Sequence, residues 1–266
     1  MTARPITSTQ NPRVKQLVLL RERRQRDRSG LFVVEGFREL SRAVEAGIDL
    51  VSVYHCPSLY LGKNEPSLVR AAVAAGAETV ELGEAAFRRA SYRDRPEGLM
   101  AVARKFDTDF DAIDLSGDPL LLIVESIEKP GNLGTMLRTA DAAGVRAVLV
   151  CDPTTDPFNP NVIRASLGTL FTVPLGISDT KTATRRLRKA GIHLVAASPK
   201  TSRLHWDADY HGGVAVVIGS EQYGLSDAWV RAADESVRIP MIGSADSLNA
   251  AAAAAVVLFE AVRQRS

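Results

Sequence analysis

The sequence lacks the short motifs that mark several familiar classes of site. It contains neither the G-x-G-x-x-G of a dinucleotide site nor the G-x-x-x-x-G-K-[ST] of a P-loop. It also contains no H-E-x-x-H and no G-x-S-x-G, so zinc-peptidase and serine-hydrolase chemistry is not supported. The 4 histidines are scattered, and nothing singles one out as an acid or a base.

Cysteine is scarce as well: there are 2, Cys56 and Cys151, without C-x-x-C spacing. This argues against a structural zinc site and a disulfide framework, so we expect no metal site and a reducing, cytoplasmic location. The longest apolar run, 250–259, is too short and too rich in alanine to span a bilayer, so we expect no membrane partner. The polar and basic N-terminal residues do not resemble a signal peptide.

What is present describes a globular α/β protein of 266 residues, with 45% hydrophobic and 24% charged residues. Residues 1–105 read as a small α/β domain that begins with an extended arm over 1–12. Residues 106–118 are acidic, contain Gly and Pro, and predict a linker. Strands alternate with helices over 119–266, which predicts a parallel sheet covered by helices on both sides.

Within the second domain, the apolar run 120–125 predicts a strand that is buried on both faces. Short strands are expected over 171–175 and 237–239. The alanine-rich stretch 247–264 predicts a closing helix, for which Ser247 is a natural N-cap.

The net charge of +2 is unevenly distributed along the chain. Residues 1–28 hold eight basic and two acidic side chains, so this segment carries +6 and the remainder −4. Such asymmetry indicates a polyanionic partner, although a solvated helix face explains a basic run equally well. The side chains expected to contact such a partner are Arg13, Lys15, Arg23, Arg24 and Arg26.

Three stretches at predicted strand ends carry the polar residues of a candidate site, because ligands bind at the carboxyl ends of strands in open α/β sheets. In 131–138, Asn132 can cap a helix and Arg138 suits phosphate recognition, while a capped helix with a surface arginine is the alternative. In 219–225, Glu221 either orients a substrate group or caps a helix. In 239–249, capping explains Ser247 but not Asn249 in a first turn.

Together and in this order, these stretches resemble the motifs of the SpoU/TrmH family of RNA 2′-O-ribose methyltransferases, in the SPOUT class. The similar segments are N-x-G-x-x-x-R-T-A from Asn132, I-G-S-E-x-x-G-L from Ile218 and I-P-M-x-G-x-x-x-S-L-N from Ile239. The N-terminal half resembles the family's substrate-binding domain through S-x-x-N-P-x-V-K from Ser8 and F-x-V-E-G from Phe32. The layout is similar to that of actinobacterial antibiotic-resistance methyltransferases of ribosomal RNA.

The resemblance implies a deep trefoil knot in the C-terminal domain, S-adenosylmethionine as cofactor, and a homodimer formed through the knot and the final helix. It implies methylation of a ribose 2′-hydroxyl, with 23S ribosomal RNA as the expected substrate. A transfer RNA methyltransferase and a non-catalytic RNA-binding module are the alternatives. The basic arm and the separate N-terminal domain disfavour a small-molecule methyltransferase.

The resemblance also assigns roles to individual residues. The implied catalytic residues are Asn132, Arg138, Glu221, Ser247 and Asn249, and the implied cofactor-binding residues are Ala197, Gly219, Ile239, Met241 and Leu248. The family proposal makes Arg138 the base, whereas arginine keeps its proton in proteins, so base and phosphate clamp both stay open. In the family's dimers, this arginine lies close to the neighbouring subunit's site.

Overall fold

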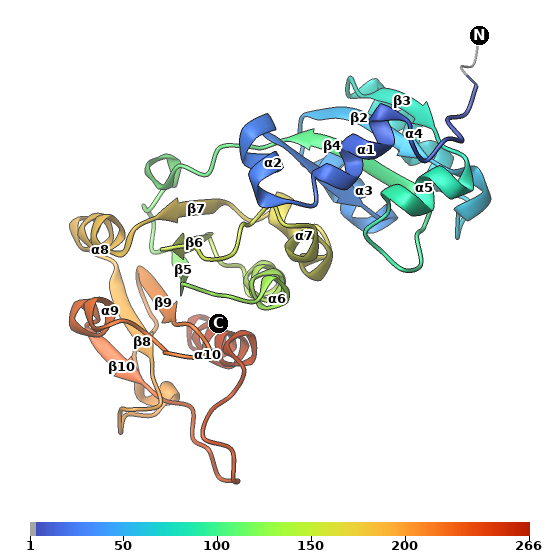
Figure 1. Cartoon of the computed structure of the whole chain (residues 1–266). Helices are drawn as coiled ribbons and strands as arrows, with labels where there is room; N and C mark the ends of the chain where they lie inside the picture. Colours follow the sequence, from blue (N-terminus) through green and yellow to red (C-terminus); the bar gives the residue numbers. More distant parts are fainter. Residues whose placement is uncertain (1–3) are drawn as a thin grey trace. The chain divides into compact units, whose positions relative to one another are not determined.

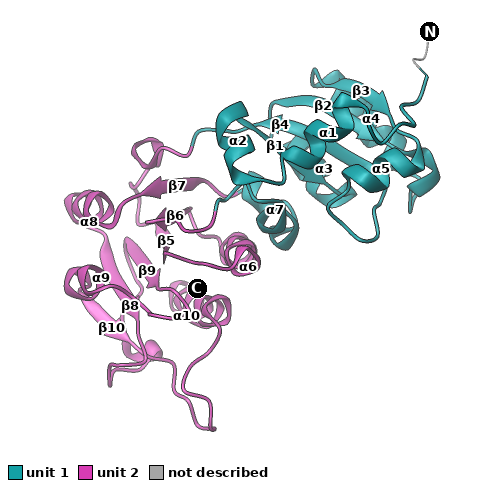
Figure 2. Ribbon diagram, viewed as in Figure 1, with its two compact units in different colours: residues 1–107, 156–172 teal, residues 108–155, 173–266 magenta. Residues whose placement is uncertain are grey.

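The computed structural model describes residues 4–266, which form two compact units (Figures 1 and 2). Unit 1 contains the chain up to Asp107 together with Asp156–Thr172, and unit 2 contains Thr108–Thr155 and Val173–Ser266. Residues 1–3 of the expected arm lie outside the described residues. Within 4–266, no helix combines the length and apolarity needed to cross a membrane.

Unit 1 is built on a four-stranded sheet with the order β1-β4-β2-β3. Strand β4 is antiparallel to both of its neighbours, and β2 and β3 are parallel. The strands are β1 (Leu31–Glu35), β2 (Leu50–His55), β3 (Glu78–Glu81) and β4 (Leu99–Arg104). The helices are α1 (Pro12–Leu19), α2 (Arg23–Ser29), α3 (Phe37–Glu45), α4 (Glu65–Ala74), α5 (Glu84–Ala90) and α7 (Pro160–Ser166).

Helix α1 shows how local sequence and packing agree in this unit. The side chain of Asn11 accepts a hydrogen bond from the backbone N–H of Arg13, and Pro12 occupies the first turn, where it costs no hydrogen bond. Val14 and Leu17 are buried in a core that they share with Phe87 of α5. Helix α2 was not predicted, because RRQRDRS contains no apolar residue and its one buried side chain is that of Arg26.

A segment from the second half of the sequence completes unit 1. Residues 156–172 contain α7 and a 3-10 turn at Thr169–Phe171, and α7 packs on β1. The rings of Phe158 and Phe32 lie 5.0 Å apart. The predicted strand over 171–175 is therefore wrong: Phe171 ends the 3-10 turn in unit 1, and β7 begins only at Leu175.

Unit 2 contains a six-stranded sheet with the order β10-β8-β9-β5-β6-β7, in which every neighbouring pair is parallel. Helices cover both of its sides, with α6 and α10 on one side and α8 and α9 on the other (Figure 2). The strands are β5 (Leu120–Glu125), β6 (Ala147–Cys151), β7 (Leu175–Ser178), β8 (His193–Ala197), β9 (Val214–Ile218) and β10 (Glu235–Val237). The helices are α6 (Pro130–Ala142), α8 (Thr180–Lys189), α9 (Asp227–Ala232) and α10 (Ala250–Arg265).

The expectations for this sheet are largely confirmed. All six residues of β5 are buried, as its apolar run predicted, because helices cover both faces. Strand β10 is placed two residues earlier than the expected 237–239. From β5 the chain first builds outward through β6 and β7, then crosses to β8 and returns to insert β9 between β8 and β5. This reversal creates a switch point at the carboxyl ends of the strands.

The expected linker over 106–118 differs from the structure. From Thr108 onward the chain belongs to unit 2, and Phe110 and Ile113 are buried in its core. The guanidinium of Arg186 lies 4.1 Å from the centroid of the Phe110 ring and donates to the backbone carbonyl of Ile113 at 2.7 Å. Gly176 leaves room for Ile113, since a Cβ at that position would lie 2.8 Å from its Cδ1. These contacts join residues far apart in the sequence, so the local composition did not reveal them.

Candidate active site

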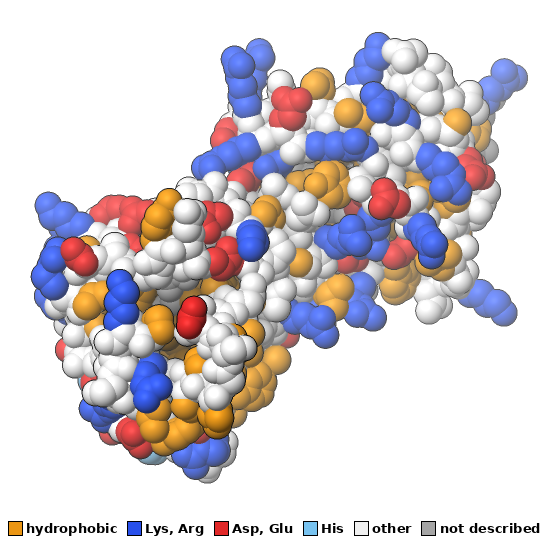
Figure 3. Space-filling model, turned by 60° about the horizontal axis from the view of Figure 1, so that its bottom comes forward, with side chains coloured by type: hydrophobic (Ala, Val, Ile, Leu, Met, Phe, Trp, Pro, Cys, Tyr) orange, Lys and Arg blue, Asp and Glu red, His pale blue; other side chains and the backbone are white. Residues whose placement is uncertain are grey.

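A cavity of about 540 Å³ lies at the carboxyl ends of β8, β9 and β10. Its walls are the loops that follow these strands and the first turn of α10. In the space-filling view of Figure 3, hydrophobic side chains gather around a hollow on unit 2. The cavity brings together all five predicted cofactor residues and two of the predicted catalytic residues: Ala197, Gly219, Glu221, Ile239, Met241, Ser247 and Leu248.

The loop after β9 is closed by a tight turn. The N–H of Ser220 donates to the carbonyl of Gly224 at 3.1 Å, and the N–H of Gly224 donates back at 3.0 Å. A Cβ at position 219 would lie 2.2 Å from the carbonyl carbon of Gly224, so only glycine fits where the loop folds back on itself. Glu221 therefore lies in a turn and not at the start of a helix. Helix α9 begins later, at Asp227, and is capped by Ser226.

The Glu221 carboxylate is enclosed but unsatisfied. Its side chain is 15% exposed, and within residues 4–266 neither carboxylate oxygen accepts a hydrogen bond. Burial raises the pKa of Glu221, and the neighbouring Glu128 raises it further, while Lys129, whose Nζ lies 4.0 Å away, lowers it. A buried polar group without a partner is costly, so this carboxylate is poised to accept hydrogen bonds from a ligand.

Two asparagines from distant parts of the sequence meet beside this loop system. The Nδ2 of Asn249 donates to Oδ1 of Asn132 at 3.3 Å, while Nδ2 of Asn132 is buried and has no partner in the described chain. Asn132 was expected to cap α6, but the helix already begins at Pro130. Asn132 thus lies within the first turn, and the N–H₂ group of its side chain is free for another role.

The start of α10 also corrects an expectation. The side chain of Asn249 accepts from the N–H of Ala251 at 2.9 Å and is the N-cap, a role that had been expected for Ser247. The polar stretch 243–248 remains outside the helix, so Ser247 is exposed and lines the cavity. The Oδ1 atom of Asn249 is therefore used in capping, while its Nδ2 atom donates to Asn132.

Arg138 lies apart from the cavity. It is exposed on α6 and, as far as the structure describes the chain, it forms no hydrogen bond or ion pair and does not line the cavity. The structure therefore brings Asn132 to Asn249 and places Glu221 and Ser247 at one cavity, but it does not bring Arg138 to the same cavity.

Lys129 and Lys200 are site residues that the sequence did not single out. Lys129 precedes α6 and is the nearest cation to Glu221, and Lys200 lines the cavity from the loop after β8. The signal for Lys129 was its place after β5 and directly before Pro130, where a strand-end loop turns into a helix. No comparable local signal marks Lys200.

The basic residues expected to bind RNA fall into three groups. Lys15, Arg23 and Arg24 are exposed, although Arg23 lies 3.6 Å from Asp27. Arg13 forms a bidentate pair with Glu78, with both distances 2.8 Å. The prediction for Arg26 is wrong, because this side chain is 1% exposed.

The partners of Arg26 explain its burial. Its Nε donates to Oδ2 of Asp156 at 2.7 Å, and its Nη1 donates to the carbonyls of Leu20 and Arg21 at 3.0 and 2.7 Å. A guanidinium committed to three partners in the interior of unit 1 is unavailable to phosphates. Its role is to hold the end of α1 and the segment that begins at Asp156.

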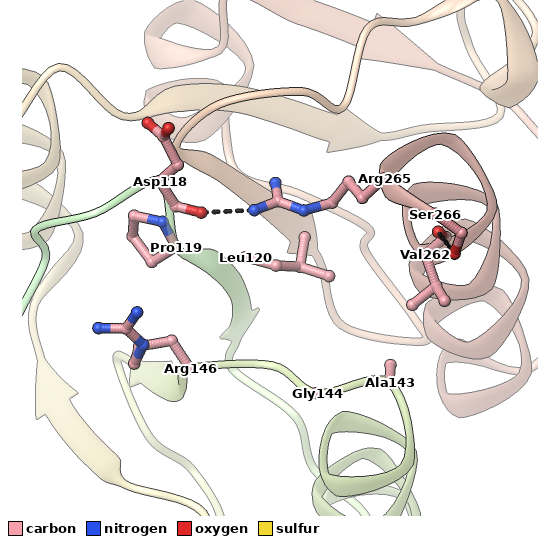
Figure 4. A pocket seen from close by; sticks show the side chains of 9 residues that line it. All are labelled: Asp118, Pro119, Leu120, Ala143, Gly144, Arg146, Val262, Arg265 and Ser266. Carbon is pink, nitrogen blue, oxygen red and sulfur yellow. Dashed lines mark hydrogen bonds between the residues drawn. The ribbon is translucent and has the colours of Figure 1, made fainter.

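A second hollow, of about 320 Å³, lies beside the start of β5 in unit 2 (Figure 4). Its central cation, Arg265, is already committed: Nη1 donates to the carbonyls of Tyr210 and Gly212 at 2.9 and 2.7 Å, and Nη2 donates to that of Asp118. These bonds anchor the end of α10. The carboxylate that lines this hollow, that of Asp118, is exposed, whereas Glu221 is enclosed, so we assign the site to the first cavity.

The fold and the site together define a class of protein: a parallel α/β unit with a ligand-sized cavity at its strand ends, joined to a second α/β unit with exposed arginines. The chain belongs to the SpoU rRNA methylase family, whose model matches residues 119–259. A model described as an MRM3-like substrate binding domain matches residues 11–101.

Relatives are similar over nearly the whole chain. A 23S rRNA (uridine(2479)-2′-O)-methyltransferase of Streptomyces viridochromogenes is 35% identical, over 99% of this chain and 93% of the relative. An rRNA methyltransferase of Sinorhizobium meliloti, solved with AdoMet bound, matches with a TM-score of 0.90 and 31% identity, over 98% of this chain and 97% of that chain. A structure described as an RNA 2′-O ribose methyltransferase matches with a TM-score of 0.86 and 40% identity, over 98% of this chain and 99% of that chain.

Proposed function

We propose that this protein transfers a methyl group from S-adenosylmethionine to a ribose 2′-hydroxyl of 23S ribosomal RNA in the cytoplasm. The observation that carries the proposal is the cavity at the ends of β8, β9 and β10, which contains an enclosed carboxylate that accepts no hydrogen bond in the described chain. Membership of the SpoU family and the full-length similarity to a 23S rRNA 2′-O-methyltransferase support the reaction and the substrate.

The residues present fit S-adenosylmethionine. Ile239, Met241 and Leu248 offer apolar surface, and the glycine at 219 keeps the wall of the cavity free of a side chain. Glu221 offers two free acceptors to the amino or hydroxyl groups of a cofactor. When bound, the cofactor supplies an electrophilic methyl group on a sulfonium.

The protein must hold the ribose hydroxyl in line with that methyl group. We assign the positioning of the hydroxyl to Asn132 and Asn249, whose side-chain amides are hydrogen-bonded to each other. The N–H₂ group of Asn132 has no partner in the described chain and can bind the substrate. We assign a contact with the same substrate to Ser247, which is exposed and lines the cavity. Arg138 has an exposed guanidinium without an intramolecular partner, which suits a clamp on the phosphate of the target nucleotide.

A homodimer would complete the site. The outer side of α10 carries Phe259, which is 48% exposed, together with the exposed Ala252 and the half-buried Val256. These positions follow helical spacing and form an apolar stripe. We propose that it packs against a second copy, as in the family's dimers, and that Arg138 then serves the partner's cavity. We also propose that the loops after β9 and β10 form the knot of the SPOUT class.

The central test measures transfer of radiolabelled methyl groups to 23S ribosomal RNA and maps the product ribose. Arg138→Ala should lower kcat by at least ~100-fold and leave the Kd for S-adenosylmethionine, measured by calorimetry, within a factor of two. Arg146→Ala, an exposed arginine elsewhere on unit 2, is the matched control. Unchanged turnover in Arg138→Ala would refute its assignment, and absence of cofactor binding by the wild type would refute the enzyme.

Mixing two inactive variants tests the shared site. Arg138→Ala and Glu221→Ala homodimers should each be inactive, whereas subunit exchange should restore part of the activity if Arg138 serves the partner's cavity. Mixtures that remain inactive after exchange has been verified would place both residues in one subunit's site. A monomer at working concentration in sedimentation would rule out the dimer.

A further inference from the structure

The loop over 91–98, between α5 and β4 in unit 1, is held by a buried polar network. Glu35, at the end of β1, is 8% exposed and accepts hydrogen bonds from the Oγ of Ser91 and from the N–H of Tyr92, the latter at 2.8 Å. Both carboxylate oxygens are thereby used. The network sets the direction in which the chain leaves α5 and so the direction in which Tyr92 points.

Arg93 supplies the positive charge of this network. Its Nη2 donates to the carbonyl of Glu35 at 2.9 Å and to Oε1 of Glu39 at 2.7 Å, and its Nη1 donates to Glu97. Gly36 makes room for it, since a Cβ there would lie 2.4 Å from Nη2 of Arg93 and the φ of +109° suits glycine. Buried ion pairs contribute little net stability, so the main effect of this network is to impose one loop geometry.

Tyr92 is the residue that this loop presents. Its neighbour Ser91 is buried, while Tyr92 itself is 38% exposed. Its backbone is held by Glu35, and its hydroxyl accepts from Nδ2 of Asn161 at 2.9 Å. The guanidinium of Arg21 lies 5.9 Å from the ring centroid and also caps the carbonyls at the end of α5. The ring is therefore fixed at both ends while part of its surface remains open.

Unit 1 carries further exposed cations, of which Arg164 is shown beside Tyr92. Arg89, Arg95 and Arg164 are exposed, and none of them donates a side-chain hydrogen bond or forms an ion pair within residues 4–266. Arg164 and Tyr92 line the same small hollow on unit 1. An aromatic ring held in place beside the unpaired guanidinium of Arg164 matches the chemistry by which proteins hold unpaired nucleotides, because their bases stack on aromatic rings and their phosphates bind arginine.

We propose that Tyr92 is a stacking surface for an unpaired base of the RNA substrate and that Arg164 binds an adjacent phosphate. The proposal rests on RNA being the substrate. An unpaired base is required because bases within an RNA helix do not offer their faces to a side chain. The site thus selects substrate RNA that contains a looped or single-stranded nucleotide.

The experiment compares two labelled probes of equal length, an oligouridylate and an abasic ribose-phosphate oligomer, by fluorescence anisotropy with the full-length protein. The wild type should bind the oligouridylate about 10-fold more tightly. Tyr92→Leu should abolish this preference, and Tyr92→Phe should retain it because the ring remains. Arg164→Ala should weaken binding of both probes equally and reduce the salt dependence by about one phosphate contact.

Equal binding of the two probes by the wild type, or an unchanged preference in Tyr92→Leu, would overturn the proposal. Should Tyr92→Leu fail to fold, crosslinking of the wild type to oligo-4-thiouridine decides instead: attachment within 91–98 supports stacking, and attachment only elsewhere refutes it. The proposed function is judged separately by methyl transfer to 23S ribosomal RNA. If the wild type methylates the RNA but binds the two probes equally, the stacking proposal fails and the proposed function stands.

Discussion

Glu35 in unit 1 and Glu221 in unit 2 are both largely buried carboxylates near the end of an apolar strand, yet their surroundings differ. Glu35 accepts hydrogen bonds on both oxygens, from Ser91 and Tyr92. Glu221 accepts none in the described chain, and its nearest cation is 4.0 Å away. The satisfied carboxylate builds a loop, whereas the unsatisfied one keeps its hydrogen-bonding capacity for a ligand.

Two arginines repeat this contrast. Arg26 is 1% exposed and fully engaged within unit 1, while Arg138 is exposed and unengaged on α6. Both belong to stretches in which the sequence suggested contact with RNA. An arginine in a basic segment is available to RNA only where no internal carboxylate or carbonyl already binds its guanidinium.

The largest effect is expected from Arg26→Ala, which leaves Asp156 buried without its partner. We expect a loss of about 3–5 kcal/mol in the free energy of unfolding, measured by urea denaturation. Arg138→Ala is the matched control and should change stability by less than ~0.5 kcal/mol. Equal losses in the two variants would erase the distinction between the two arginines.

A smaller loss is expected from Glu35→Gln. Glutamine keeps the volume but replaces one acceptor oxygen by an N–H₂ group, so the bond with the Ser91 hydroxyl must reverse or be lost. The bonds that remain lose the charge of the carboxylate. The cost should be about 1–3 kcal/mol in urea denaturation. Hydrogen exchange should accelerate at the amide of Tyr92, and an unaltered exchange rate would show that Glu35 does not hold the loop.

Glu221→Gln should raise the free energy of unfolding, whereas the two variants above lower it. This change is expected to be the smallest of the three. Because burial raises the folded-state pKa of Glu221, the ionised form destabilises the empty protein at neutral pH. The variant should be more stable than the wild type there and should lose affinity for S-adenosylmethionine.

The sign of this effect can be followed with pH. Below the ordinary Glu value of 4.5, both folded and unfolded chains are protonated and the wild type pays no penalty. As pH rises from that value through the raised folded-state pKa, the unfolded chain ionises first, so the wild type loses stability relative to Glu221→Gln. Thermal unfolding at successive pH values measures the stability difference between the wild type and Glu221→Gln. A difference that stays constant across this range would show that the pKa of Glu221 is not raised in the folded state.

Much of the candidate site could be predicted from the sequence, because the site residues lie in short motifs at strand ends. Gly219, Glu221 and Met241 are close in sequence to β9 and β10, so their joint appearance at one cavity followed from a parallel sheet. The N-cap of α10 was misplaced by two residues, because Ser and Asn are both good caps and local preference does not choose between them.

Local sequence is enough to predict the buried strand β5, the parallel α/β pattern and the chemistry of the strand-end loops, because each of these is encoded over a few consecutive residues. Tertiary packing, by contrast, buries Arg26 against Asp156, adds residues 156–172 to unit 1 and brings Asn132 to Asn249. Arg26 and Asp156 are 130 positions apart, Asn132 and Asn249 are 117 apart, and α7 packs on β1 near the start of the chain. Their partners are chosen by burial and charge pairing in the folded chain, on which local periodicity and propensity carry no information.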